Sequence, residues 1–135
     1  MRVFADTFYF FALLNPNDQA HRTAVSYSET FAGELVTTRL VLVEFADGFS
    51  STQNRLLASN LIRSIQIDPE FTIVPLSDGL FERGLDLFTN RADKNWSLTD
   101  CLSFCVMEEL GITQALTGDR PFAQAGFVPL LKSDT

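Results

Sequence analysis

The sequence predicts an α/β fold in which a short sheet of parallel strands carries helices on both faces. Short apolar runs rich in β-branched and aromatic residues alternate along the chain with longer segments of helical periodicity. Polar residues that commonly cap helices stand directly before several of these periodic segments. A chain of 135 residues, of which 46% are hydrophobic, suits one domain around a single core.

The first half of the chain is expected to form two strands and four helices. The apolar run at residues 2–5 ends at Asp6, which can cap a helix over 7–14. Thr38 can cap a later helix, and Gly48 begins the break that follows it. In chain order, the expected elements are a strand at 2–5, helices at 7–14 and 18–35, a strand at 35–37, and helices at 39–49 and 52–65.

The second half is expected to form three strands and two helices. Ser97 with Asp100 three residues later fits a capping box, and Gly111 ends the helix that this box begins. Ser77 can cap the preceding helix, and Pro129, which lacks an amide donor, places the last strand at the sheet edge. In chain order, the expected elements are a strand at 71–75, helices at 78–89 and 97–110, and strands at 114–117 and 127–131.

Helical spacing also indicates which side chains face the core. Cys101 and Cys105 are four residues apart, so both lie on one face of a helix as structural thiols. With a single His in the chain, they cannot complete a four-ligand zinc site. On the two helices before them, the residues expected to point inward are Leu56, Leu57, Leu61, Ile65, Leu80, Phe81, Leu85 and Phe88.

Charge and hydropathy exclude several classes of protein. The formal net charge is −7, which argues against general electrostatic binding of nucleic acid. It does not exclude an enzyme acting on nucleic acid, because acids that hold a divalent metal contribute to this charge. No apolar run reaches the length of a membrane span, and no A-x-A-like cleavage site follows the run at 8–14. We therefore expect no membrane association and a cytoplasmic location.

Four acidic residues stand within apolar segments or at their ends. Asp6 and Asp119 follow predicted strands, whereas Glu44 and Asp100 lie on predicted helices. Because parallel strands end at one edge of a sheet, acids far apart in sequence can gather there. Glu44 interrupts an apolar segment, so its charge must be paired, solvated through a cleft or bound to a metal ion. Surface acids and helix caps are the competing explanation.

A cluster of carboxylates is unfavourable without a cation. Two unit charges about 4 Å apart repel by roughly 4 kcal/mol at an effective dielectric constant of about 20. Such a site therefore binds cations or raises some carboxyl pKa values. Oxygen ligands favour hard ions such as Mg²⁺ or Mn²⁺, which can activate water and stabilise charge on phosphate. Hydrolysis of phosphodiester bonds fits this chemistry.

Several segments, taken in order, resemble the motifs of the PIN domain family and, within it, of the VapC-like ribonucleases. The segment at 93–101 is the most specific, and the resemblance spans nearly the whole chain. Relatives often place a His shortly after the fourth acid, where this chain has Arg120-Pro121, so the expected local contacts with substrate differ. The matching segments are Val3–Thr7, Asn15–His21, Thr37-Thr38 with Val43-Glu44, Asp93–Cys101, Leu116–Asp119 and Phe122–Phe127.

The resemblance implies a single PIN domain over residues 1–135, folded as a three-layer α/β/α sandwich with a short central parallel sheet. It also implies an acidic site that binds Mg²⁺ (or Mn²⁺) and carries the catalysis. The implied metal-site and catalytic residues are Asp6, Glu44, Asp100 and Asp119, and the implied supporting residues are Thr7, Asp93 and Ser97.

The implied function is a Mg²⁺-dependent endoribonuclease that hydrolyses RNA phosphodiester bonds as the toxin of a type II toxin–antitoxin pair. The expected partners are RNA, a small antitoxin protein and a second copy of the chain in a homodimer. Apolar residues on short helices, such as Leu56, leave room for an exposed dimer patch. The alternative is a PIN-fold protein with little catalysis that acts by binding RNA or a partner protein.

Other residues with possible roles have simpler explanations. Trp96 could stack on a base, but a buried anchor beside the helix that begins at Ser97 is the favoured interpretation. His21 is expected on a helix surface rather than as a general base. Cations that could contact phosphates, with scattered surface charge as the alternative, are Arg22, Arg39, Arg91, Lys94 and Arg120.

Overall fold

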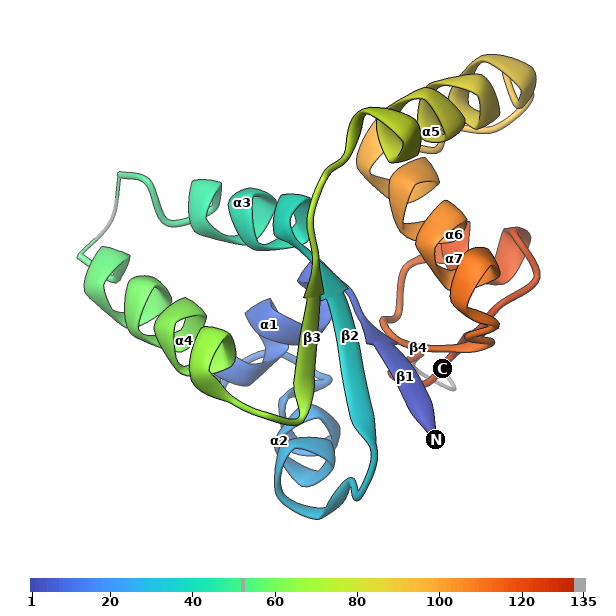
Figure 1. Ribbon diagram of the computed structural model, residues 1–135. Coiled ribbons are helices and arrows are strands. Elements are labelled where there is room, and N and C mark those ends of the chain that lie inside the picture. The colour runs from blue at the N-terminus through green and yellow to red at the C-terminus, as the bar shows by residue number, and fades with distance from the viewer. Residues whose placement is uncertain (52, 133–135) are drawn as a thin grey trace.

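The computed structural model describes residues 1–51 and 53–132, which form a five-stranded, all-parallel sheet flanked by helices (Figure 1). The predicted α/β class and three-layer arrangement are confirmed, and the strand order is β3-β2-β1-β4-β5. The strands are β1 Arg2–Ala5, β2 Glu34–Thr38, β3 Phe71–Val74, β4 Gln114–Leu116 and β5 Val128–Pro129. The helices are α1 Thr7–Leu14, α2 His21–Thr30, α3 Arg39–Asp47, α4 Arg55–Ile67, α5 Asp78–Asn90, α6 Leu98–Leu110 and α7 Arg120–Gln124.

The helices form two groups on opposite sides of the sheet. In the first group α1 packs against α2 and α3, and α3 packs against α4; in the second, α6 packs against α5 and α7. Figure 1 shows α3 and α4 on the left of the strands and α6 and α7 on the right. The strand β1 lies in the middle, with Val3 in register with Leu35 of β2 and Phe4 in register with Ala115 of β4.

Phenylalanine rings fill the core on both sides of the central strands. On the first side, Phe10 of α1 lies 5.8 Å from Phe45 and 6.2 Å from Phe71, measured between ring centroids. On the second side, Phe122 lies 6.3 Å from Phe4 and 5.0 Å from Phe104. These aromatic contacts fix the helices against the sheet on both faces, because close-packed cores resist displacement of their side chains.

Two predicted boundaries were wrong for identifiable local reasons. The helix expected over 18–35 is shorter, because the Asp18 carboxylate accepts a hydrogen bond from the Ala20 amide (2.8 Å) and stabilises a turn there. Its predicted end belongs to β2, which begins at Glu34 after Gly33. The helix predicted over 52–65 was expected to start at residue 52, which lies outside the described residues.

The short helix α7 was not predicted. It has only five residues, with a proline in its first turn, so it offers too few positions for helical periodicity to be recognised. The last strand is also shorter than the predicted 127–131.

The predicted inward faces of α4 and α5 were only partly correct. On α4 the buried residues are Ala58 and Ile65, whereas Leu56 and Leu57 are 71% and 47% exposed. On α5, Leu80 and Gly84 are buried. Because Gly84 has no side chain, α5 can pack closely against Leu102 of α6 at this position. The other three residues expected to point inward from α5 are exposed; they are Phe81, Leu85 and Phe88.

Replacing Gly84 by alanine is expected to lower the free energy of unfolding by about 1–2 kcal/mol, because overpacking forces α5 and α6 apart. An added Cβ at Gly84 would lie 2.8 Å from Leu102 Cγ, and Leu102 is buried. Urea denaturation measures the change. The matched control is Gly79→Ala on the same helix, where the nearest atom, on Arg83, is 3.4 Å away. This control should gain about 0.5–1 kcal/mol through higher helix propensity. Equal gains in both variants would contradict close packing at Gly84.

Candidate functional site

Four acids from four different elements lie near the edge of the sheet where the parallel strands end. Asp6 follows β1 and is the N-cap of α1, and Asp119 follows β4 and is the N-cap of α7. Because β1 and β4 are neighbours, their carboxyl ends lie side by side. Asp100 lies in the first turn of α6, and Glu44 lies on α3. We call Asp6, Glu44, Asp100 and Asp119 the four-acid cluster.

The charges of the four acids act on one another. Burial raises the pKa of Asp6 to about 7, and repulsion by Asp119 and Asp100 adds to this increase. Burial also raises the pKa of Asp100, with further contributions from Asp119 and Glu44. The pKa of Asp119 is raised by burial and by the charge of Glu44. Each of the four predicted acids therefore lies within electrostatic reach of at least two of the others.

Two threonine hydroxyls orient acids of the cluster. Thr7 Oγ1 donates a hydrogen bond to Glu44 Oε1 (2.6 Å). Glu44 itself is exposed on α3, so its charge is both solvated and paired with this hydroxyl. Thr117 Oγ1 donates to Asp6 Oδ2 (2.8 Å), a role that the sequence did not single out. The available signal was its position, because Thr117 lies at the end of the predicted strand at 114–117, just before Asp119.

The capping box at the start of α6 holds Asp100 in place. Ser97 Oγ accepts a hydrogen bond from the Asp100 amide (3.0 Å), and the Ser97 amide donates to Asp100 Oδ2 (3.1 Å). The predicted box is therefore present, and the carboxylate that begins the helix is also a member of the four-acid cluster. These hydrogen bonds favour the ionised carboxylate and oppose the effect of burial on the pKa of Asp100.

Asp93 lies in the loop before α6 and makes its ion pair with Arg91 rather than with the cluster. Two nitrogens of Arg91 donate to the two Asp93 carboxylate oxygens (3.0 and 3.2 Å). The Arg91 guanidinium also lies over the Trp96 ring, 4.8 Å from its centroid. Trp96 is buried and donates from Nε1 to Gln124 Oε1 (2.9 Å), so the interpretation as an anchor is confirmed.

The remaining polar candidates have structural contacts. His21 Nδ1 lies 2.7 Å from the Ala12 carbonyl oxygen, a contact that joins the start of α2 to α1. Cys101 and Cys105 are free thiols; Cys101 is buried, and Cys105 is half-buried. Burial raises the pKa of both thiols, which keeps them protonated and unreactive.

The donor set of the cluster fits a hard divalent cation, because it consists of carboxylates whose charges oppose one another. In residues 1–51 and 53–132, no group of three or more His, Cys, Asp or Glu side chains is arranged to hold a metal ion as it stands. Binding a metal ion would therefore require the carboxylates to draw closer together.

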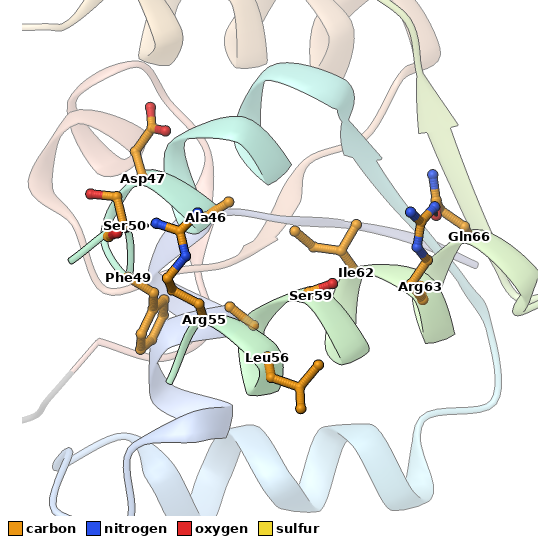
Figure 2. A pocket seen from close by; sticks show the side chains of 11 residues that line it. Ala46, Asp47, Phe49, Ser50, Arg55, Leu56, Ser59, Ile62, Arg63 and Gln66 are labelled. Atoms are coloured by element: carbon orange, nitrogen blue, oxygen red, sulfur yellow. Dashed lines mark hydrogen bonds between the residues drawn. The ribbon is translucent and has the colours of Figure 1, made fainter. Parts of the chain in front are cut away.

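A separate cavity of about 630 Å³ lies between α3 and α4 (Figure 2). Figure 2 shows Arg55, Leu56 and Ile62 projecting from α4, with Ala46 and Asp47 on the facing α3. None of the four acids lines this cavity. It offers an apolar surface with basic side chains and is distinct from the acidic edge.

The model of the PIN domain family matches residues 3–128. Among solved structures, the chain is similar to VapC20 of Mycobacterium tuberculosis, described as a sarcin–ricin loop cleaving toxin. The TM-score is 0.84 at 26% identity, covering 96% of this chain and 98% of that chain. A toxin–antitoxin complex from Klebsiella pneumoniae is similar in fold, with a TM-score of 0.64 at 17% identity and 90% of each chain covered. Comparison with curated protein sequences gives no significant match.

Proposed function

Since the chain belongs to the PIN domain family, we propose that it is a metal-dependent endoribonuclease of the VapC type and the toxin of a type II toxin–antitoxin pair. The carrying observation is that carboxylates from four separate elements lie near one edge of the sheet, where burial and the neighbouring acidic charges raise the pKa values of Asp6, Asp100 and Asp119. Similarity to VapC20, described as a toxin that cleaves the sarcin–ricin loop, supports RNA as the substrate.

The four-acid cluster would hold Mg²⁺ or Mn²⁺. Bound metal supplies charge neutralisation at the phosphate and lowers the pKa of a coordinated water. The chain's own groups orient the ligands: the Thr7 hydroxyl donates to the Glu44 carboxylate, and the Ser97 backbone amide donates to the Asp100 carboxylate. Arg120 follows the fourth acid directly and is exposed, so it can contact a backbone phosphate of the RNA.

The decisive test is cleavage of end-labelled RNA by purified protein with EDTA, with Mg²⁺ and with Mn²⁺. We expect internal cuts only when a divalent metal is present, and no cuts in DNA of the same sequence. RNA that is bound but left intact under all three conditions would favour the alternative, a PIN-fold protein that acts through binding.

A small antitoxin protein is the proposed partner, and it should present an arginine to the four-acid cluster. A guanidinium matches carboxylates in a two-pronged geometry and would replace the charge of the metal ion. The cavity between α3 and α4 offers an apolar surface for the part of the antitoxin next to this arginine. A structure of the complex would test this; contacts that all avoid Asp6, Glu44 and Asp100 would contradict it.

We also propose that the chain, as a single PIN domain over 1–135, forms a homodimer in the cytoplasm. Apolar side chains remain exposed on two helices, at Leu56 and Leu57 of α4 and at Phe81 and Phe88 of α5. No helix in the described part of the chain is both long and apolar enough to cross a lipid bilayer. A monomer mass in light scattering at micromolar concentrations would contradict the dimer.

A further inference from the structure

The hydroxyl of Thr117 uses both its donor and its acceptor capacity inside the site. Its hydrogen goes to Asp6 Oδ2 (2.8 Å), and its oxygen accepts from the Asp119 amide (3.1 Å). Thr117 is completely buried, so water does not compete for either bond. One side chain thus joins the first acid of the cluster to the backbone of the fourth, across 111 residues of sequence.

The backbone around Thr117 is itself held in place. Its amide donates to the Ala115 carbonyl (3.0 Å), and its carbonyl accepts from the Leu131 amide (3.0 Å). A rotation of the side chain away from Asp6 would take a hydrogen bond from a buried hydroxyl and from a buried carboxylate, which is costly. The hydroxyl is therefore a rigid reference point for both acids.

We propose that Thr117 is a positioning residue of the four-acid cluster, whose hydroxyl holds the Asp6 carboxylate beside the Asp119 backbone and so limits how far the carboxylates must move to bind a divalent metal ion. The inference rests on the proposed metal-dependent function. Hydrogen bonds from outer residues to metal ligands typically change metal affinity by about 10–100-fold when removed. Thr117 does not itself contact substrate in this role.

The test compares Thr117→Val, which keeps the shape and removes the hydroxyl, with Thr117→Ser, which keeps the hydroxyl. Calorimetric titration with Mn²⁺ should show about tenfold weaker binding for Thr117→Val and affinity within about threefold of wild type for Thr117→Ser. RNA cleavage should follow the same order. If the valine variant does not fold, Thr117→Ala takes its place, with circular dichroism as the check.

Thr37 provides the matched control. It is also a fully buried threonine, near the end of β2, but its hydroxyl donates to the Ala5 carbonyl (2.8 Å) and not to a carboxylate. Thr37→Val should lose stability to a similar extent, about 1 kcal/mol, and keep its Mn²⁺ affinity within about threefold of wild type. Equal losses of affinity in the two valine variants would overturn the proposed role of Thr117.

A double-substitution cycle connects the effect to Asp6. If the hydroxyl acts mainly through that carboxylate, adding Thr117→Val to Asp6→Asn should weaken Mn²⁺ binding by no more than about twofold further. Wild-type Mn²⁺ affinity in the folded Thr117→Val variant would refute the inference alone. Absence of Mn²⁺ binding and of RNA cleavage in the wild-type protein would instead refute the proposed function.

Discussion

Asp100→Asn should lower RNA cleavage by about a hundredfold or more, equivalent to roughly 3 kcal/mol in the barrier, while the fold survives. Asparagine keeps the size of the side chain, and its carbonyl oxygen can still accept from the Ser97 amide, so the capping box can form. The substitution removes one negative charge from the four-acid cluster and weakens its hold on a divalent cation. Initial rates of cleavage at saturating Mg²⁺ measure the effect.

Thermal melts separate loss of metal binding from loss of fold. With Mn²⁺ at a hundredfold excess over its dissociation constant, the wild-type protein should gain about 2.7 kcal/mol of stability. Asp100→Asn should gain clearly less. The control is Asp78→Asn, at an exposed acid in the first turn of α5, which should behave as wild type in both assays. Identical Mn²⁺ responses in wild type and Asp100→Asn would remove Asp100 from the site.

The metal-free protein should lose stability as pH rises, and Asp6→Asn should remove much of this loss. Burial raises the pKa of Asp6 to about 7, so the folded state holds this proton up to about pH 7, whereas the unfolded chain releases it near the ordinary carboxyl pKa of 3.8. Between these values the folded state binds more protons, so the free energy of unfolding falls with rising pH. The buried carboxyl, 4% exposed, should contribute roughly 4 kcal/mol to this fall.

Urea denaturation in EDTA at pH 4.5, 6 and 8 tests this prediction. At pH 8 the Asp6→Asn variant should be more stable than wild type, because its neutral amide avoids a buried charge and can still accept from Thr117. Asp86→Asn, at an exposed position on α5, should keep the wild-type pH dependence. An unchanged slope in Asp6→Asn would mean that another group carries the titration.

Helix caps made most of the fold predictable from the sequence. Thr38, Ser77 and Ser97 each accept the predicted capping hydrogen bond, and the helices they begin start where expected. Boundaries failed where a side chain competes with helical periodicity, as at Asp18, or where an element is too short to show a period, as in α7. The prediction of which residues of α4 and α5 face the core was partly wrong, because small residues such as Gly84 make the close contacts there. Larger apolar side chains on these helices are exposed to solvent.

The acids of the candidate site were predictable because Asp6, Asp100 and Asp119 stand where a strand ends or a helix begins, and Glu44 interrupts an apolar segment. The hydrogen bonds that connect these acids were not predictable, because they depend on which strands pair in the folded sheet. The Thr117–Asp6 hydrogen bond requires β1 and β4 to be neighbours, which no local pattern in the sequence shows. The ion pair of Asp93 was also missed, although it is local in sequence. Arg91 lies only two residues away and takes that carboxylate in a local ion pair.

The placement of β1 between β2 and β4 has a consequence for the order of folding. β1 is synthesised before β4, so its pairing with β4 must wait for residues 114–116. Closing contacts between such distant residues is entropically costly and slow. The four-acid cluster can therefore form only after residue 119 has been added, and a nascent chain that ends before this residue would lack the proposed nuclease activity.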